Sequence, residues 1–177
     1  LAGPGESQYT FYDKEICSRT QIWLREKALK ESKPWVLFVS FVAPHFPLTA
    51  PPEHFYKYWG KDLPMPLLYA REQRPKHPYL EDYRNSFCYD DYFESADQVK
   101  KALCGYFGLV SYLDENIGKI LKTLDEIGLS DSTNILYTSD HGDNLGARGL
   151  WGKSTMLEEI AGVPLIMAGP DVSKGAQ

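Results

Sequence analysis

"NILYTSDHGDNLGARGLWGKS", residues 134–154, is a short β-type run followed at once by a charged, glycine-rich loop. The run NILYTS predicts a strand over 134–139, and Asp140, His141 and Asp143 come directly after it. Charged groups beside a buried strand are costly to desolvate unless a partner compensates them. A bound cation is the first candidate for that partner, because carboxylates and imidazoles are good ligands of divalent cations.

The loop carries four glycines, at positions 142, 146, 149 and 152, which allow positive φ and close approach to a ligand. Asp143 could have one of three roles: it could bind a metal directly, accept a hydrogen bond from a residue that binds the metal, or cap the following turn. The spacing alone supports a cation site and a solvated turn, in which Asp140 caps backbone N–H groups, about equally.

Two amphipathic helices lie upstream of this loop. A row, or stripe, of residues at helical spacing predicts a helix over 13–31. Its members are Ile16, Thr20, Trp23, Leu24 and Ala28. Lys33-Pro34 follows and breaks the helix. A second stripe steps by four and three residues and predicts a helix over 96–127, with Gly128 where a glycine would end it. Its members are Val99, Leu103, Tyr106, Val110, Leu113, Ile117, Ile120 and Leu124.

Two further apolar runs predict strands. WVLFVSFVA, residues 35–43, is nearly all apolar, as in a strand covered on both faces, and VPLIMAG, residues 163–169, predicts another. Strand, helix, strand is the βαβ pattern, so we expect an α/β fold with a mostly parallel sheet flanked by helices. Ligands bind at the carboxyl ends of parallel strands. His45 and Asp140, each just past a predicted strand, should therefore meet at one edge of the sheet.

His45 and Lys153 are the remaining candidates for chemistry. His45 lies in APHFP, where two prolines stiffen the chain, and could donate to an anionic oxygen or protonate a leaving group. A strand-end histidine satisfied by the backbone is the alternative. Lys153 could place a point charge on an anionic oxygen, although most isolated lysines are ordinary surface residues.

Composition excludes several classes of protein. The chain has 19 Lys and Arg against 24 Asp and Glu, a net charge of −5, which gives no reason to expect a nucleic-acid partner. It contains no apolar run of about 18 residues, so no membrane span is expected. Cys17, Cys88 and Cys104 fit neither a disulfide framework nor a CxxC metal site, which favours a reducing compartment. No signal-peptide pattern is visible, and the localisation stays open.

Three blocks of this sequence resemble the sulfatase family of the alkaline-phosphatase superfamily, with choline-sulfatase-like and phosphonate-monoester-hydrolase-like members most similar. The blocks are FVSFVAPHFPLTAPPE (38–53), YFGLVSYLDENIGKIL (106–121) and ILYTSDHGDNLGARGLWGKS (135–154), with VPLIMAGP after them. The resemblance implies an alkaline-phosphatase-like fold, here incomplete, and hydrolysis of small-molecule sulfate esters.

The resemblance also implies roles for four residues. Asp140 and His141 would form half of a divalent-metal site, usually Ca²⁺, with Mn²⁺ or Mg²⁺ in some relatives. Lys153 would contact the sulfate, and His45 would contact the sulfate or the leaving group. Such a convergence would stabilise charge that develops on the oxygens of a tetrahedral anion.

The sequence departs from the family at its start. Relatives carry an N-terminal C-x-P-S-R or S-x-P-S-R motif, whose Cys or Ser becomes the formylglycine nucleophile, and N-terminal aspartates that complete the metal site. Neither is present, because Cys17-Ser-Arg19 lacks the x-Pro element. We expect residues 1–177 to be the central part of a sulfatase catalytic domain, with an irregular insertion at about 48–95.

On this view the missing N-terminal segment is a partner of the chain, and formylglycine lies only there. The chain alone should have no normal turnover. Two alternatives are a phosphonate monoester or phosphodiester hydrolase of the same superfamily, and a non-catalytic fragment that binds a cation or an anion.

Overall fold

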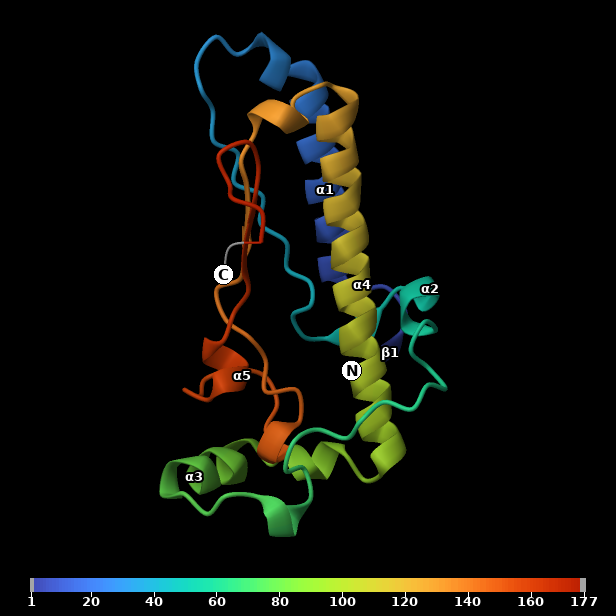
Figure 1. Ribbon diagram of the computed structural model, residues 1–177. Coiled ribbons are helices and arrows are strands. Elements are labelled where there is room, and N and C mark those ends of the chain that lie inside the picture. The colour runs from blue at the N-terminus through green and yellow to red at the C-terminus, as the bar shows by residue number, and fades with distance from the viewer. Residues whose placement is uncertain (1, 176–177) are drawn as a thin grey trace.

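Two long helices form the centre of the computed structural model, which describes residues 2–175. They are α1 (Gln8–Glu26) and α4 (Ala96–Glu126). In Figure 1, α1 lies against the C-terminal half of α4, and the chain that follows α4 runs back beside this pair, mostly as extended chain. The helix α3 (Pro78–Phe87) lies at the other end, near the start of α4. Within residues 2–175, the helices are all too short or too polar to cross a membrane.

The helix α4 matches the prediction over 96–127 closely. The Ser95 hydroxyl caps its start by accepting from the Gln98 amide. At its end Gly128 adopts φ +71, and its N–H donates to the Asp125 carbonyl while the Leu129 N–H donates to the Leu124 carbonyl. This pair of bonds is the Schellman motif, so the predicted terminal glycine has its expected role.

The helix α1 begins earlier than the prediction over 13–31. Ser7 is its N-cap, because the Ser7 hydroxyl accepts from the Thr10 amide and the Thr10 hydroxyl accepts from the Ser7 amide. The helix ends at Glu26 and is followed by the 3₁₀ turn η1 (Ala28–Lys30). Leu24 and Ala28 pack on Leu124 of α4, which confirms the C-terminal part of the predicted stripe.

Residues 35–43 differ from the prediction. Within residues 2–175 this segment is neither a helix nor part of a strand ladder. Trp35 and Leu37 pack on the cluster between α1 and α4, while Val36 and Phe38 are 98% and 88% exposed. The predicted strand covered on both faces, and its parallel pairing with 134–139, are therefore wrong. Apolar composition indicates a preference for burial, but it does not say which neighbour supplies the ladder hydrogen bonds.

The other two predicted strands are present as β3 (Ile135–Thr138) and β4 (Leu165–Ala168). They pair antiparallel, with Ile135 opposite Ala168 and Thr138 opposite Leu165. The parallel pair of the structure joins β1 (Ala2–Pro4) to β2 (Leu48–Ala50) instead. The sequence did not predict this pair, because strands of three residues are too short to show a period.

The strand β2 crosses α4 at a glycine. A Cβ atom at Gly105 would collide with the carbonyl oxygen of Leu48, so the two backbones can touch only because this position has no side chain. Leu48 follows His45 by three residues. This crossing therefore fixes one end of the turn that carries His45.

The region 48–95, predicted to be irregular, contains several short elements joined by loops. They are β2, α2 (Pro52–Phe55), η2 (Arg71–Gln73), α3 and η3 (Tyr89–Tyr92). In Figure 1 this region crosses from α2 on one side of α4 to α3 on the other. The last part of the chain adds η4 (Ser130–Ser132), η5 (Ala147–Gly149) and α5 (Glu158–Ala161).

Candidate functional site

The four residues singled out from the sequence lie together. Lys153 Nζ is 2.9 Å from His141 Nε2 and 3.4 Å from His45 Nε2. Asp140 Oδ2 is 3.5 Å from His141 Nε2. Lys153 and His45 are separated by 108 residues in the sequence, so the fold brings them together. We refer to His45, Asp140, His141 and Lys153 as the His-Lys cluster.

Both imidazoles of the His-Lys cluster have the same tautomer. His45 Nδ1 lies 2.7 Å from the Phe46 carbonyl oxygen, and His141 Nδ1 lies 2.7 Å from the Gly142 carbonyl oxygen. A carbonyl can only accept, so each Nδ1 carries the hydrogen and donates it. Each Nε2 therefore turns a lone pair toward Lys153, whose ammonium group is a donor only.

Asp140 stands at the solvent side of the cluster, with its side chain 84% exposed. Its carboxylate accepts hydrogen bonds from the His141 amide and the Ser139 hydroxyl. Partial desolvation raises the pKa of Asp140, but His141 and these hydrogen bonds outweigh it, and the pKa lies below its ordinary value. Asp140 is therefore ionised near neutral pH and can face a cation or the Lys153 ammonium group.

Asp143 organises the glycine-rich loop. One of its carboxylate oxygens accepts from the amides of Leu145 at 2.8 Å and Gly152 at 3.1 Å, which ties the two ends of the loop together. Burial raises the pKa of Asp143 above its ordinary value, although these two amides oppose the shift. Of its three possible roles, the structure shows the cap for the following turn.

Asn144 closes the same loop and was not singled out by the sequence. Its side chain is buried, and both its amide groups donate to the Gly152 carbonyl, the backbone at 2.8 Å and the side chain at 2.9 Å. Lys153 is the next residue along the chain. The Asp143-Asn144 pair therefore fixes the backbone that carries the Lys153 side chain.

The helix α3 holds the other side of Lys153. The Tyr83 hydroxyl donates to the Lys153 carbonyl, and the Tyr79 hydroxyl donates to the Ser154 carbonyl at 2.6 Å. Ser154 has φ +78, an unusual value for a residue with a side chain. Sequence reasoning missed both tyrosines, because a hydroxyl that acts on a distant backbone carbonyl leaves no local motif.

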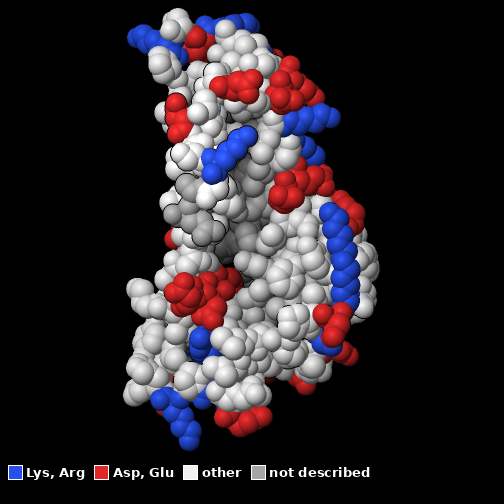
Figure 2. All heavy atoms as spheres, viewed as in Figure 1, with Lys and Arg blue, Asp and Glu red and all other residues white. Residues whose placement is uncertain are grey.

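A cavity of about 1140 Å³ opens beside the His-Lys cluster. Figure 2 shows it as a hollow between α4 and the chain that follows it. One side of its wall is the cluster itself, and most of the remainder is apolar or aromatic. The aromatic members are Phe41, Phe46, Phe87, Tyr89, Tyr92, Phe93, Tyr106, Tyr137 and Trp151. Several belong to the end of the 48–95 region.

Asp140 and His141 fit part of a divalent-cation site. A carboxylate and the lone pair of an imidazole nitrogen are suitable ligands, although in this structure the lone pair of His141 Nε2 faces Lys153 Nζ. Among residues 2–175, however, no group of three or more His, Cys, Asp or Glu side chains could hold a metal ion. Asp140 and His141 are the two residues of the cluster that could contact a cation, and Lys153 Nζ lies 2.9 Å from the His141 Nε2 atom that would have to face it.

The other reactive residue types lie elsewhere. Arg74 makes a paired contact with Asp90, at 2.8 and 2.9 Å, and does not join the cluster. His54 is buried and contacts Glu115 on α4. Cys17 is buried between α1 and α4, and burial raises the pKa of its thiol, so it is not poised as a nucleophile.

Comparison with known proteins gives matches along almost the whole chain. The sulfatase family model matches residues 2–177. The choline-sulfatase of Rhizobium meliloti is 36% identical over 182 residues, which cover 99% of this chain and 36% of that protein. An arylsulfatase of Clostridium perfringens is 33% identical over 139 residues, which cover 78% of this chain and 28% of that protein.

Solved structures share the α/β fold. The phosphonate monoester hydrolase SpPMH of Silicibacter pomeroyi gives a TM-score of 0.77 at 27% identity, covering 91% of this chain and 34% of that one. The phosphonate monoester hydrolase of Agrobacterium radiobacter gives 0.73 at 21% identity, covering 96% and 36%. The chain thus spans about a third of the length of these relatives, and its fold is part of an alkaline-phosphatase-like α/β fold.

Proposed function

Because the chain belongs to the sulfatase family, we propose that the whole protein hydrolyses sulfate esters of small molecules at the His-Lys cluster. The observation that carries the proposal is the contact of Lys153 Nζ with the Nε2 atoms of both His45 and His141. The Lys153 ammonium group and two imidazole Nε2 atoms thus converge at one side of a cavity large enough for a small ester; Lys153 can donate to an anion, and His45 can do so once its Nε2 is protonated.

Lys153 has the role of an anion-holding group. Its ammonium group carries three donors and a full positive charge, and it would contact an oxygen of the sulfate. Charge grows on the ester oxygens as the sulfur–oxygen bond breaks, so a fixed cation there stabilises the transition state more than the ground state. The bonds from Tyr83 and Asn144 hold the backbone on each side of Lys153 and support a fixed position.

His45 has the role of proton donor to the leaving oxygen. Its Nδ1 hydrogen is committed to the Phe46 carbonyl, so only Nε2 can take up a proton and release it. In the imidazolium form that proton would pass from Nε2 to the departing alcohol oxygen, and the ring would become neutral.

Asp140 and His141 would hold a divalent cation, for which Ca²⁺ is our first choice and Mn²⁺ or Mg²⁺ the alternatives. A bound cation would neutralise sulfate charge beside Lys153. Residues beyond this chain would supply the remaining ligands and the nucleophile. The resemblance implies a formylglycine hydrate, and residues 1–177 contain no C-x-P-S-R or S-x-P-S-R motif. We therefore expect the chain alone to be inactive.

The test is an assay of the whole purified protein for anion release. Sulfate release from an aryl sulfate or from choline sulfate, at a rate well above that for matched phosphonate monoesters and phosphodiesters, is the expected result. Choline sulfate is included because a similar protein is a choline-sulfatase. The same assay on residues 1–177 alone checks the expected inactivity.

A phosphonate monoester or phosphodiester hydrolase is the second candidate, since phosphonate monoester hydrolases share the fold. Both reactions present a tetrahedral anion to the same groups. Faster release from phosphonates or phosphodiesters than from sulfates would favour this candidate. If the whole protein hydrolyses none of these esters but still binds a cation or sulfate, the result would favour the non-catalytic binding role.

A further inference from the structure

Asp13 is a buried carboxylate in the first half of α1, and its exposed fraction is 0%. Its Oδ1 accepts from the Val42 amide and its Oδ2 accepts from the Ala43 amide, both at 2.8 Å. No Lys, Arg or His among residues 2–175 pairs with it. Burial raises the pKa of Asp13, and the two amides only partly offset that cost. Because burying an unpaired carboxylate destabilises the fold, we asked which part of the structure Asp13 holds in place.

Asp13 holds the turn that presents His45. The His45 amide donates to the Val42 carbonyl at 2.9 Å, so residues 42–45 form one hydrogen-bonded turn. The segment before this turn has no ladder partner among the described residues. The two bonds to Asp13 are therefore the polar anchor on the N-terminal side of His45. On the other side, β2 is fixed against Gly105 of α4.

Tyr9, one helical turn before Asp13, makes a second contact with the same turn. Its ring meets the His45 imidazole edge-on, with the ring centres 5.7 Å apart and the planes at 85°. Residues four apart lie on one face of a helix. One face of α1 thus bears on the backbone before His45 and on the His45 ring.

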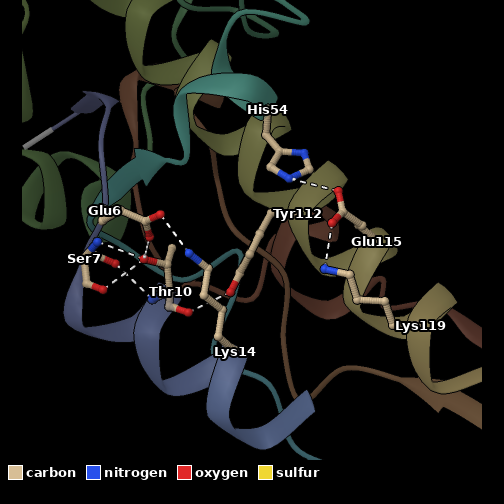
Figure 3. Close-up of polar contacts among 8 residues, drawn as sticks. All are labelled: Glu6, Ser7, Thr10, Lys14, His54, Tyr112, Glu115 and Lys119. Atoms are coloured by element: carbon tan, nitrogen blue, oxygen red, sulfur yellow. Dashed lines mark hydrogen bonds and ion pairs between the residues drawn. The ribbon is translucent and has the colours of Figure 1, made fainter. Parts of the chain in front are cut away.

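The first turns of α1 are themselves held in place, as Figure 3 shows. Thr10 and Ser7 cap each other, and the Thr10 hydroxyl donates to Glu6 at 2.8 Å. Tyr112 of α4 donates its buried hydroxyl to the Thr10 carbonyl at 2.6 Å. This bond ties the start of α1 to α4, so Tyr9 and Asp13 lie on a rigid support.

We propose that α1 positions His45 for proton transfer, through the hydrogen bonds of Asp13 to residues 42 and 43 and the ring contact of Tyr9. Both are positioning residues: Asp13 contacts the backbone amides of residues 42 and 43, and Tyr9 contacts the His45 ring. This inference rests on the proposed function, in which His45 protonates the leaving oxygen. A displacement of about 1 Å at a reacting group can lower a rate about a hundredfold, so positioning has a measurable effect.

The experiment uses the whole protein and a series of aryl sulfates whose leaving groups range from good to poor. We compare Asp13→Asn, His45→Ala, the double variant, and Glu15→Gln. Glu15 is the control, because it is an exposed carboxylate on the same helix and pairs with the exposed Arg19. Thermal unfolding is measured for each variant, and only variants that keep a cooperative transition are compared.

The expected result for Asp13→Asn is a loss of kcat that grows as the leaving group becomes poorer. We expect a loss of about tenfold or more for the poorest leaving groups and less than about threefold for the best. His45→Ala should give the same pattern with larger losses. The double variant should be no slower than His45→Ala alone, because Asp13 acts through His45. Glu15→Gln should resemble the unchanged protein.

Two outcomes overturn the inference. Asp13 has only a structural role if Asp13→Asn lowers kcat equally for all substrates, and if the fold decrease in the double variant equals the product of the two single decreases. If His45→Ala itself shows no dependence on the leaving group, the proton-donor role of His45 fails and the inference fails with it. The His45→Ala series alone therefore distinguishes the two failures.

A second variant covers the case in which Asp13→Asn does not fold. Tyr9 is 41% exposed, so Tyr9→Leu should fold while losing the ring contact with His45. The expected result is again a loss selective for poor leaving groups. An equal loss for all substrates, or no loss, would overturn the proposal.

Discussion

Lys153 is the residue on which the proposed chemistry depends most. Its ammonium group lies within 3.4 Å of two imidazole nitrogens, and the loop and α3 fix its backbone. Lys153→Ala should lower kcat/KM of the whole protein for sulfate esters by about two to three orders of magnitude, since it removes a fixed charge from the transition state. Steady-state kinetics measure this.

Lys122→Ala is the matched control for Lys153. Lys122 is an exposed lysine of α4, whose ion pair with Glu126 is long, at 3.9 Å. Its removal should leave kcat/KM within about twofold. A change of less than threefold for Lys153→Ala would contradict the anion-holding role.

Asp140 tests the cation that we propose for the same cluster. Asp140→Asn removes a ligand charge but keeps the size of the side chain, so Ca²⁺ affinity of the whole protein should fall at least about tenfold. Titration calorimetry measures the affinity directly. Asp131→Asn, at an exposed aspartate of η4, is the control and should bind Ca²⁺ unchanged. Equal affinities for the two variants would argue against Asp140 as a ligand.

The sequence indicated the members of the His-Lys cluster but not the residues that hold them. His45 and Asp140 stood out because each follows an apolar run, and Lys153 because it follows a glycine-rich loop. Asp13, Tyr79 and Tyr83 act on backbone groups far away in the sequence. A backbone amide or carbonyl is the same at every position, so no residue pattern marks such a partner.

The elements of the fold differ in how well the sequence predicts them. Helix α4 was predictable, because eight apolar residues repeat at helical spacing over its length. Residues 35–43 were not, since an apolar run does not reveal whether a neighbouring strand is there to pair with it. The expected meeting of His45 with the 140–153 loop nevertheless occurs, because α1 and β2 hold the turn at residues 42–45.

The contact between η2 and η3 gives an element-scale prediction about acid stability. Arg74 makes two hydrogen bonds to Asp90, and Arg71 lies 3.1 Å from the same carboxylate. The hydrogen bond from Arg74 is the main cause that holds the pKa of Asp90 below its ordinary value of 3.8. The folded protein therefore binds this proton less readily than the unfolded chain.

The sign of the pH effect follows from that difference. Asp90 contributes stability above its ordinary pKa, and the contribution is lost as the pH falls through the lowered value of the folded protein. Asp90→Asn should therefore lose less stability between pH 6 and pH 3 than the unchanged protein does. Urea unfolding midpoints at these two pH values measure this. Asp91→Asn is the control. If Asp90→Asn loses as much stability between pH 6 and pH 3 as the unchanged protein does, Asp90 is not the source of the acid sensitivity.

At the scale of the whole molecule, the site depends on segments that are far apart in the sequence. The 42–45 turn brings His45, the loop after β3 brings Asp140 and His141, and the end of that loop brings Lys153 under α3. The cavity beside them is walled by α4 and the aromatic end of the 48–95 region. If the whole protein hydrolyses a sulfate ester as we propose, the organic part of that ester would meet this wall.

The most direct test of the central claim is a double-mutant cycle between His45 and Lys153 in the whole protein, with kcat/KM for one sulfate ester as the readout. If both groups act on one bound anion, the double variant should lose less than the product of the two single losses, as expected for residues that share a partner. Losses that multiply fully, or single variants that keep full activity, would contradict a common site for the two residues.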